Sequence, residues 1–425
     1  DVYKRQVDMK MEELDKPKMS FFEVLTAMAI WKFADAPVDV AIVEVGMGGR
    51  WDATNVLDAD AAIIGPVDMD HMAWLGNTVE QIASEKVGII KPGCTAVIGR
   101  QPHEEAVMPI IEEAAKQNHA NLVRDGIEAE VVTRIPAVGG QVVTLRTPNG
   151  TYAEVPVAKF GEHQAHNALA ALCAAEVVIP VNGALDGDLV AEALSTVKIP
   201  GRIEQIRTSP TIILDGGHNV NAAESLRAAI EENYDFQQLV GVIAMMGDKQ
   251  VEEYLGVLEP LLSHVIVTEN SWRDRVMPAG DLKKIAERVF GAERVTCVPE
   301  LPDAIQEAVN MVDADDELGV GYGHGVLICG SFTTAGDARL MLEEKVNPDL
   351  KKPKSERVFQ EAVEPEPRKD QDEADLDFES DANPDFDIND FGSVGPDLAE
   401  NEDTDVSEDA ADTERADDAS SDGVR

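Results

Sequence analysis

The chain has 425 residues, of which 44% are hydrophobic, and this is enough for two folded domains with sizeable cores. Its formal net charge of −45 excludes binding to nucleic acid through neutralisation of phosphates. No apolar run approaches the length of about 18 residues that a membrane span needs. The four scattered cysteines (Cys94, Cys173, Cys297 and Cys329) form no C-x-x-C pair, which favours a reducing cytoplasm.

In the first half of the chain, helical and strand-like apolar patterns alternate. A helix is predicted at residues 20–33, with Ser20 as N-cap and Glu23 completing a capping box. A buried apolar run at 38–45 then enters a glycine-rich turn. The elements predicted next are a buried strand at 61–67, a helix at 78–88, a strand at 95–98 and a helix at 104–117.

Turn signals and a second alternation organise the rest of the folded part. The pairs Gly139-Gly140 and Asn149-Gly150 predict β-hairpins over residues 129–157, followed by a helix at 164–178. The Pro200-Gly201 pair marks a domain boundary. Beyond it, strands at 211–214, 239–244, 265–267 and 326–329 alternate with helices at 221–233, 251–262 and 280–290. This order indicates an α/β fold with mainly parallel sheets and a Rossmann-like second half.

The end of the chain differs in composition from the rest. Residues 361–425 carry about 25 acidic and about 4 basic residues, a net charge of roughly −21. Few aliphatic side chains accompany these charges, so the segment is unable to bury enough surface to offset the entropy of ordering. We therefore predict a disordered acidic tail over residues 346–425. Docking of a basic partner onto it is the functional alternative.

Polar residues follow two of the predicted strand-like runs. Glu44 ends the first run, and the glycines after it would let a ligand approach the backbone closely at the carboxyl edge of a sheet. A tight turn explains the same glycines equally well. His71 closes the segment after the second strand, where a structural role and a metal role both stay open. Lys86, beside Glu85 on the next helix, is by itself typical of a solvated pair.

Several long motifs occur together and in one order. They are residues 20–25, 44–55 (EVGMGGRWDATN), 70–91 (DHMAWLGNTVEQIASEKVGIIK), 161–167, 200–202 and 215–219. Through these motifs the chain resembles the Mur-ligase superfamily, and specifically its folate branch, over nearly all of residues 20–340. The resemblance implies a P-loop-type ATPase domain at 1–199, a smaller Rossmann-like domain at 200–345 and the tail at 346–425.

The resemblance also implies an activity. Members of this branch are ATP-dependent ligases that join L-glutamate to dihydropteroate or reduced folates. The folate carboxylate attacks the γ-phosphate of ATP, and the amine of glutamate then displaces phosphate from the acyl phosphate. ATP as substrate, Mg²⁺ as cofactor, small-molecule partners only and a cytoplasmic monomer are therefore expected.

The resemblance also implies roles for individual residues in the matching motifs. Glu44, His71 and a carbamylated Lys86 would ligate Mg²⁺, because a carbamate supplies the hard oxygen ligands that this ion prefers. Asp52 and Asn55 would hydrogen-bond the pterin.

Further residues are expected at the ATP. Asn167 would lie near the adenine and Asp215 would hold the ribose, while Arg202 and His218 would contact the phosphates. Alternatively, Arg202 forms a salt bridge between the domains, and residues 215–219 form a glycine turn with a helix cap. Lys86, Arg202 and His218 are the predicted catalytic residues.

The beginning of the chain departs from the family pattern. Members carry a G-x-x-G-K-[ST] phosphate loop ahead of the helix predicted at 20–33, and this sequence contains no Gly-Lys dipeptide. Residues 1–6 include no initiator Met and no signal-peptide core. We therefore expect a polypeptide that lacks the first strand and the phosphate loop, with ATP turnover absent or very weak.

Two other functions stay open. A peptidoglycan-precursor Mur ligase would act on a UDP-linked substrate, although residues 48–55 favour folate. A non-catalytic folate- or nucleotide-binding protein would lack the phosphate loop naturally. The coding sequence upstream of Asp1 distinguishes this last possibility, because a phosphate loop there would remove it.

Overall fold

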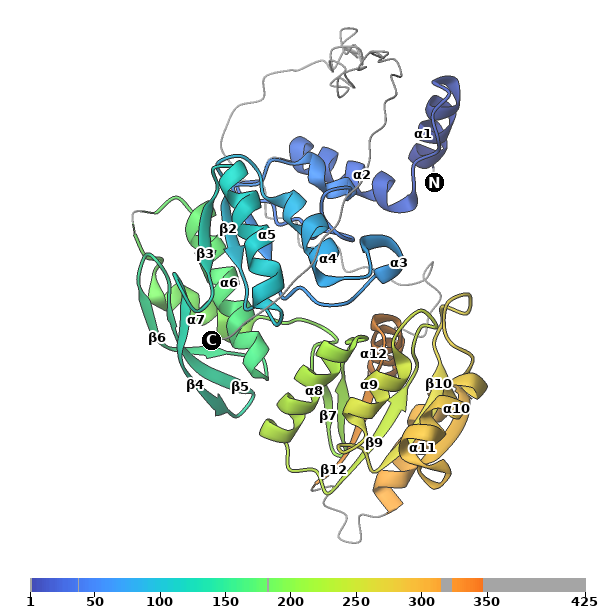
Figure 1. The fold of residues 1–425 in the computed structure, drawn as a ribbon. Coiled ribbons are helices and arrows are strands. Elements are labelled where there is room, and N and C mark those ends of the chain that lie inside the picture. The colour runs from blue at the N-terminus through green and yellow to red at the C-terminus, as the bar shows by residue number, and fades with distance from the viewer. Residues whose placement is uncertain (1, 37, 182, 315–322, 347–425) are drawn as a thin grey trace, which may run out of the picture. The chain divides into compact units, whose positions relative to one another are not determined.

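The computed structural model describes residues 2–36, 38–181, 183–314 and 323–346 (Figure 1). Residues 347–425, and with them nearly all of the predicted acidic tail, lie outside the described residues. No helix among the described residues is long and apolar enough to cross a membrane.

The chain begins with two helices, α1 (Val2–Glu13) and α2 (Phe21–Asp35). The predicted capping box of α2 is confirmed. The Ser20 hydroxyl accepts the backbone N–H of Glu23 at 3.2 Å, and the Glu23 carboxylate accepts the backbone N–H of Ser20 at 2.6 Å. These bonds satisfy two of the N–H groups left free at a helix start.

The apolar run at residues 38–45 differs from its prediction. It forms no strand, and its side chains are exposed except that of Val45, which is half-buried; Ile42 is 92% exposed. An apolar run becomes a strand only where a neighbouring strand satisfies its backbone groups, and none of the described strands pairs with it. The predictions that this run is buried and that Glu44 ends a sheet strand are therefore wrong.

The first sheet is parallel, in the order β1-β2-β3, and consists of β1 (Ala61–Ile64), β2 (Thr95–Ile98) and β3 (Asn121–Arg124). Its helices are α3 (Met72–Leu75), α4 (Val79–Lys86) and α5 (Glu104–Gln117), with short 3-10 turns η1 (Ala53–Val56) and η2 (Val87–Ile89). Ile64, Ile82, Ile98 and Ile111 pack together between sheet and helices. β1 is an edge strand of this sheet.

A second sheet is antiparallel, in the order β4-β5-β6, as the turn pairs predicted. It consists of β4 (Glu130–Ala137), β5 (Gly140–Arg146) and β6 (Thr151–Val157), and it packs on α6 (Glu162–Val178) and α7 (Gly187–Thr196). Leu145, Val155 and Leu169 lie in this core.

A buried carboxylate joins α6 to this sheet. Glu176 accepts hydrogen bonds from the Tyr152 hydroxyl at 2.6 Å, the Thr147 hydroxyl at 2.9 Å and the Asn149 amide at 3.1 Å. Burial, and then the bond to Glu176, raises the pKa of Tyr152 to about 12. The three donors replace the water that the carboxylate loses on folding.

We expect Glu176→Ala to lower the free energy of unfolding by about 2–4 kcal/mol, because it leaves buried donors without their acceptor. Urea denaturation measures this loss. Glu192→Ala, at an exposed position on α7, is the matched control and should change stability by less than about 0.5 kcal/mol. Equal effects of the two substitutions would show that the Glu176 network contributes nothing particular.

The third sheet has the order β11-β10-β9-β12-β8-β7 and is parallel except for the antiparallel edge strand β7. Its strands are β7 (Glu204–Thr208), β8 (Thr211–Leu214), β9 (Gln238–Ile243), β10 (His264–Glu269), β11 (Val295–Glu300) and β12 (His324–Cys329). Its helices are α8 (Val220–Asn233), α9 (Val251–Leu258), α10 (Ala279–Phe290), α11 (Leu301–Ala314) and α12 (Phe332–Val346), with a turn η3 (Ala292–Arg294).

Helices cover both faces of this third sheet (Figure 1). Ile213 and Leu327 point toward α8, α9 and α10, whereas Ile212 and Val326 point toward α11 and α12. Successive residues of a strand face opposite sides of the sheet. Because both sides are buried here, each of these strands is a continuous apolar run in the sequence. The predicted α/β architecture with a Rossmann-like second half is confirmed.

Candidate active site

Two cavities adjoin at the carboxyl end of β1. The smaller has a volume of about 310 Å³ and the larger about 590 Å³. Ile63, Gly65, Pro66 and Asn221 line both of them. Because the cavities share these walls, an elongated ligand could lie with one end in each. The carboxyl end of a parallel strand is also the usual position for a ligand in α/β folds.

The smaller cavity collects titratable side chains from the segment after β1 and from α4. Asp68, Asp70, His71 and Lys86 line it. Burial lowers the pKa of Lys86, against a raising effect of the nearby Asp70 carboxylate. A lysine with a lowered pKa is more often neutral, and carbon dioxide reacts with the neutral amine. The environment of Lys86 therefore agrees with its predicted carbamylation.

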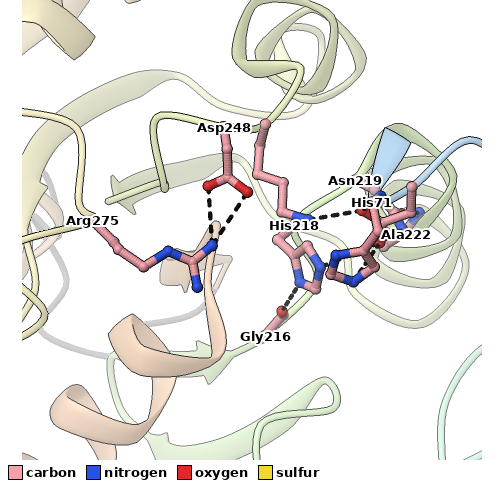
Figure 2. Close-up of polar contacts among 9 residues, drawn as sticks. His71, Gly216, His218, Asn219, Ala222, Asp248 and Arg275 are labelled. Atoms are coloured by element: carbon pink, nitrogen blue, oxygen red, sulfur yellow. Dashed lines mark hydrogen bonds and ion pairs between the residues drawn. The ribbon is translucent and has the colours of Figure 1, made fainter. Parts of the chain in front are cut away.

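Asp70 is the centre of a network that reaches the loops after β8 and β9. Figure 2 shows His218 and Asn219 of this network beside His71. The Lys249 ammonium lies 2.8 Å from one carboxylate oxygen, and the Asn219 amide lies 3.4 Å from the other. The His218 ring nitrogen Nε2 is 3.6 Å from that second oxygen. Burial alone would raise the pKa of Asp70, but the interactions with His218 and Lys249 lower it far below the usual range.

His71 adopts a strained conformation beside Asp70. Its φ of 52° and ψ of 34° lie in the left-handed region, which a residue with a Cβ rarely adopts. Burial lowers the pKa of its imidazole, and the Lys249 and His218 charges add to this effect against Asp70. A neutral imidazole is the form that binds metals. Strain of this kind typically occurs at functional sites.

The turn at residues 200–203 and the loop after β8 are joined by Asp215. Its two carboxylate oxygens accept the backbone N–H groups of Ile203 at 3.0 Å and Gly217 at 2.7 Å. Burial raises the pKa of this carboxyl group, against the effect of those bonds. Both oxygens are thus engaged within the protein, so the structure gives Asp215 a positioning role for the loops, and its predicted ribose contact stays a prediction.

One aromatic ring lies close to two predicted phosphate-binding residues. The Arg202 guanidinium lies 4.2 Å from the centre of the Phe332 ring, and the His218 ring is 6.2 Å from the same ring. Stacking of this kind holds a guanidinium in place without using its N–H donors. Arg202 can therefore keep donors available for an anion, and among the described residues it forms no salt bridge of the kind considered above.

The predicted pterin residues have local partners in the glycine-rich loop. Asp52 accepts the backbone N–H groups of Met47 at 2.9 Å and Thr54 at 3.0 Å, and it caps η1. Asn55 donates to the carbonyls of Arg50 and Gly88, both at 3.1 Å. These bonds shape the loop around the smaller cavity. Contact with a pterin stays a prediction for both residues.

The larger cavity is lined by the first turns of α6 and by α8. Asn167 lines it, as do His163 and His166. Burial lowers the pKa of His163 to about 4, so this ring is neutral at physiological pH. His166 is held by Asp125, with 2.5 Å between its Nδ1 and a carboxylate oxygen. The wall is therefore uncharged at His163 and fixed at His166.

The predicted metal ligands are only partly brought together. His71 and Lys86 line the smaller cavity, whereas Glu44 is exposed and does not line it. Within the part of the chain that the structure describes, no three His, Cys, Asp or Glu side chains group as a metal site. A carbamate on Lys86 together with Asp70 would offer hard oxygen donors, which suit Mg²⁺ in chemical type. Metal ligation by Glu44 stays a prediction.

Comparison with known proteins shows to which family the chain belongs. Residues 9–175 match the Mur ligase middle domain, and residues 201–332 match the Mur ligase glutamate ligase domain. A dihydrofolate synthase/folylpolyglutamate synthase of Mycobacterium tuberculosis is 43% identical over 338 residues, which cover 76% of this chain and 69% of that protein. The chain belongs to the Mur ligase family.

Further relatives place this Mur ligase in the folate branch. A dihydrofolate synthase/folylpolyglutamate synthase of Escherichia coli is 30% identical, over 77% of this chain and 70% of its own length. The solved structure of M. tuberculosis folylpolyglutamate synthase with ADP has a TM-score of 0.73 at 42% identity, covering 78% of this chain and 74% of that one. E. coli FolC with DHPP and ADP has a TM-score of 0.65 at 26% identity, covering 77% and 72%.

Two residues of the site received no role from the sequence. Lys249 follows β9 at the carboxyl edge of the third sheet, and a lysine in that position is a signal that would have identified it. Asp70 lies inside a quoted motif, but its partners lie 149 and 179 positions away in sequence. Only the fold brings them together.

Proposed function

We propose that this Mur ligase uses ATP to join L-glutamate to dihydropteroate or to a reduced folate, through an acyl phosphate. The observation that carries the proposal is the shared wall of the two cavities. ATP lying across Gly65, Pro66 and Asn221 would place its base beside Asn167 and its phosphates beside Lys86 and Asp70. The M. tuberculosis and E. coli relatives that bind ADP support a nucleotide in this fold.

The reaction joins two anionic substrates, so positive charge near the phosphates is its main requirement. A carboxylate oxygen of the folate substrate attacks the γ-phosphorus, and ADP leaves. The glutamate amine then attacks the acyl carbon, loses its proton, and phosphate leaves with the former carboxylate oxygen. Arg202 and His218 would stabilise the charge on the phosphoryl oxygens, as cationic and hydrogen-bonding side chains do in phosphoryl transfer.

Asp70 has a positioning role in this site. Its strongly lowered pKa makes it a poor general base, because it holds a proton too weakly to accept one efficiently. Its contacts to Lys249, His218 and Asn219 instead hold these groups at the cavity. Mg²⁺, when bound by His71 and a carbamylated Lys86, would neutralise charge on the phosphates.

We expect Ala171→Trp to weaken ADP binding by at least about tenfold, because the indole would fill part of the larger cavity. Ala171 is exposed on α6 and lines that cavity, so the substitution leaves the core intact. Calorimetric titration with ADP measures the effect. Val177→Trp, at another exposed position of α6, is the control. ADP binding that is equal in the two variants would place the base elsewhere.

The substrate assignment is tested by ADP release in the presence of Mg²⁺. Dihydropteroate, tetrahydrofolate and a UDP-muramoyl peptide are compared as acceptors, each with and without glutamate, using this chain and the chain extended by its upstream coding sequence. Release that needs both glutamate and a pterin supports the proposal. Release with the UDP compound alone favours a peptidoglycan-precursor ligase, and no release with any acceptor favours a non-catalytic binding protein.

A further inference from the structure

An ion pair at the larger cavity joins the antiparallel sheet to α8. The two outer nitrogens of Arg134 on β4 bind the two carboxylate oxygens of Glu232 on α8; the Nη1 contact measures 2.7 Å. Both residues line the cavity. A guanidinium and a carboxylate joined by two parallel hydrogen bonds form the strongest and most directional type of surface ion pair.

A second hydrogen-bond partner, Gln141, fixes the Arg134 side chain. Its Nε donates to the amide oxygen of Gln141 at 2.5 Å, and Gln141 is only 2% exposed. The Gln141 amide nitrogen donates in turn to the carbonyls of Lys159 at 2.8 Å and Gly161 at 2.9 Å. Gly161 is the N-cap of α6, the helix that carries His163 and Asn167. A continuous chain of hydrogen bonds therefore runs from α8 to the start of α6.

This arrangement differs from an ordinary surface salt bridge in two respects. The Arg134 side chain is 16% exposed and that of Glu232 33%, whereas both partners of the Arg288–Glu252 pair on α10 and α9 are 55% exposed. In addition, the Arg134–Glu232 pair connects two elements, β4 and α8, that both contribute to the lining of one cavity. Exposed pairs contribute little, but an anchored and partly buried pair holds its two elements together more firmly.

We propose that Arg134 and Glu232 form a latch that holds α8 against the antiparallel sheet and so sets the affinity of the larger cavity for its nucleotide. The proposal rests on the assignment of that cavity to the base of ATP. Both residues are positioning residues, since they hold the wall and need not touch the base. In the binding-competent arrangement the ion pair is formed and α8 lies against the antiparallel sheet. A substitution that breaks the pair lowers the fraction of molecules in this arrangement, so the apparent affinity for the nucleotide falls in proportion.

The test measures ADP affinity by calorimetry and amide hydrogen exchange of residues 160–168 and 224–232. Glu232→Ala and the isosteric Glu232→Gln are compared with the wild type, and Glu252→Ala is the matched control. We expect both Glu232 variants to bind ADP about tenfold more weakly and to exchange faster in both segments, with the control unchanged. The double variant Arg134→Glu/Glu232→Arg should recover most of the affinity.

One result would overturn the latch: ADP affinity and hydrogen exchange in both Glu232 variants within about twofold of the wild type, whatever their loss of thermal stability. ADP binding that is equal in Ala171→Trp and the wild type would refute the nucleotide assignment instead. The exchange comparison would then still decide whether the ion pair holds the two walls together.

Discussion

Replacing Lys86 with alanine is expected to lower the turnover number of the full-length protein by about a thousandfold, with the fold unchanged. Lys86 lines the smaller cavity with Asp70 and His71, where the phosphates of ATP are proposed to lie. Without its nitrogen no carbamate can form, so the site loses an oxygen donor for the charge-neutralising ion. ADP release at saturating substrates measures the effect, and circular dichroism checks the fold.

A matched lysine and a spectroscopic measurement make this prediction specific. Lys116→Ala, at an exposed position on α5, should keep full turnover. Enrichment with ¹³C-bicarbonate should give the wild type a carbamate carbon resonance that Lys86→Ala lacks. Turnover in Lys86→Ala close to that of the wild type would remove Lys86 from the catalytic residues. The same resonance in both proteins would show that any carbamate forms elsewhere.

Replacing Asp70 with asparagine is expected to lower kcat/KM by about a hundredfold. The substitution keeps the size of the side chain but removes the charge that faces Lys249, whose side chain is only 10% exposed. Leaving a partly buried ammonium without its carboxylate is costly, and His218 and Asn219 lose the same acceptor. Steady-state kinetics with ATP and glutamate varied separately measure the loss.

A double-mutant cycle shows whether the loss comes from the Asp70–Lys249 pair. Lys249→Met alone should cost a similar factor, and Asp70→Asn/Lys249→Met should lose far less than the product of the two factors. Independent, multiplying losses would contradict the network, because they would mean that the two residues act separately on the substrates.

Local sequence patterns were sufficient for most of the fold. The strands β2 and β8 have the predicted bounds because each is a short apolar run. The helix α5 has its predicted bounds because its apolar residues recur at helical spacing. The hairpins of β4–β6 followed from their glycine turns. By contrast, the strand β7 and the helix α7 were not predicted. β7 is an edge strand with a largely exposed surface, so it lacks a clear apolar signal. α7 did have a signal that would have identified its start, because Asp186 is its N-cap.

Local sequence patterns were not sufficient to predict the site. Lys86 and His71 carry their roles in motifs, and the structure places both at one cavity. Glu44 was expected at the end of a buried strand, but whether a run is buried depends on neighbouring strands that a local pattern does not reveal. The network around Asp70 and the Arg134–Glu232 pair depend on long-range packing, with 98 positions separating the latch residues. No spacing rule identifies such contacts.

A folate carboxylate is expected to be activated as an acyl phosphate before glutamate attacks. The most direct test uses dihydropteroate labelled with ¹⁸O in its carboxylate, together with ATP, Mg²⁺ and glutamate. We predict that the inorganic phosphate released contains one ¹⁸O atom per amide bond formed, because the carboxylate oxygen leaves with the phosphate. Amide formation that releases only unlabelled phosphate would contradict the acyl-phosphate route.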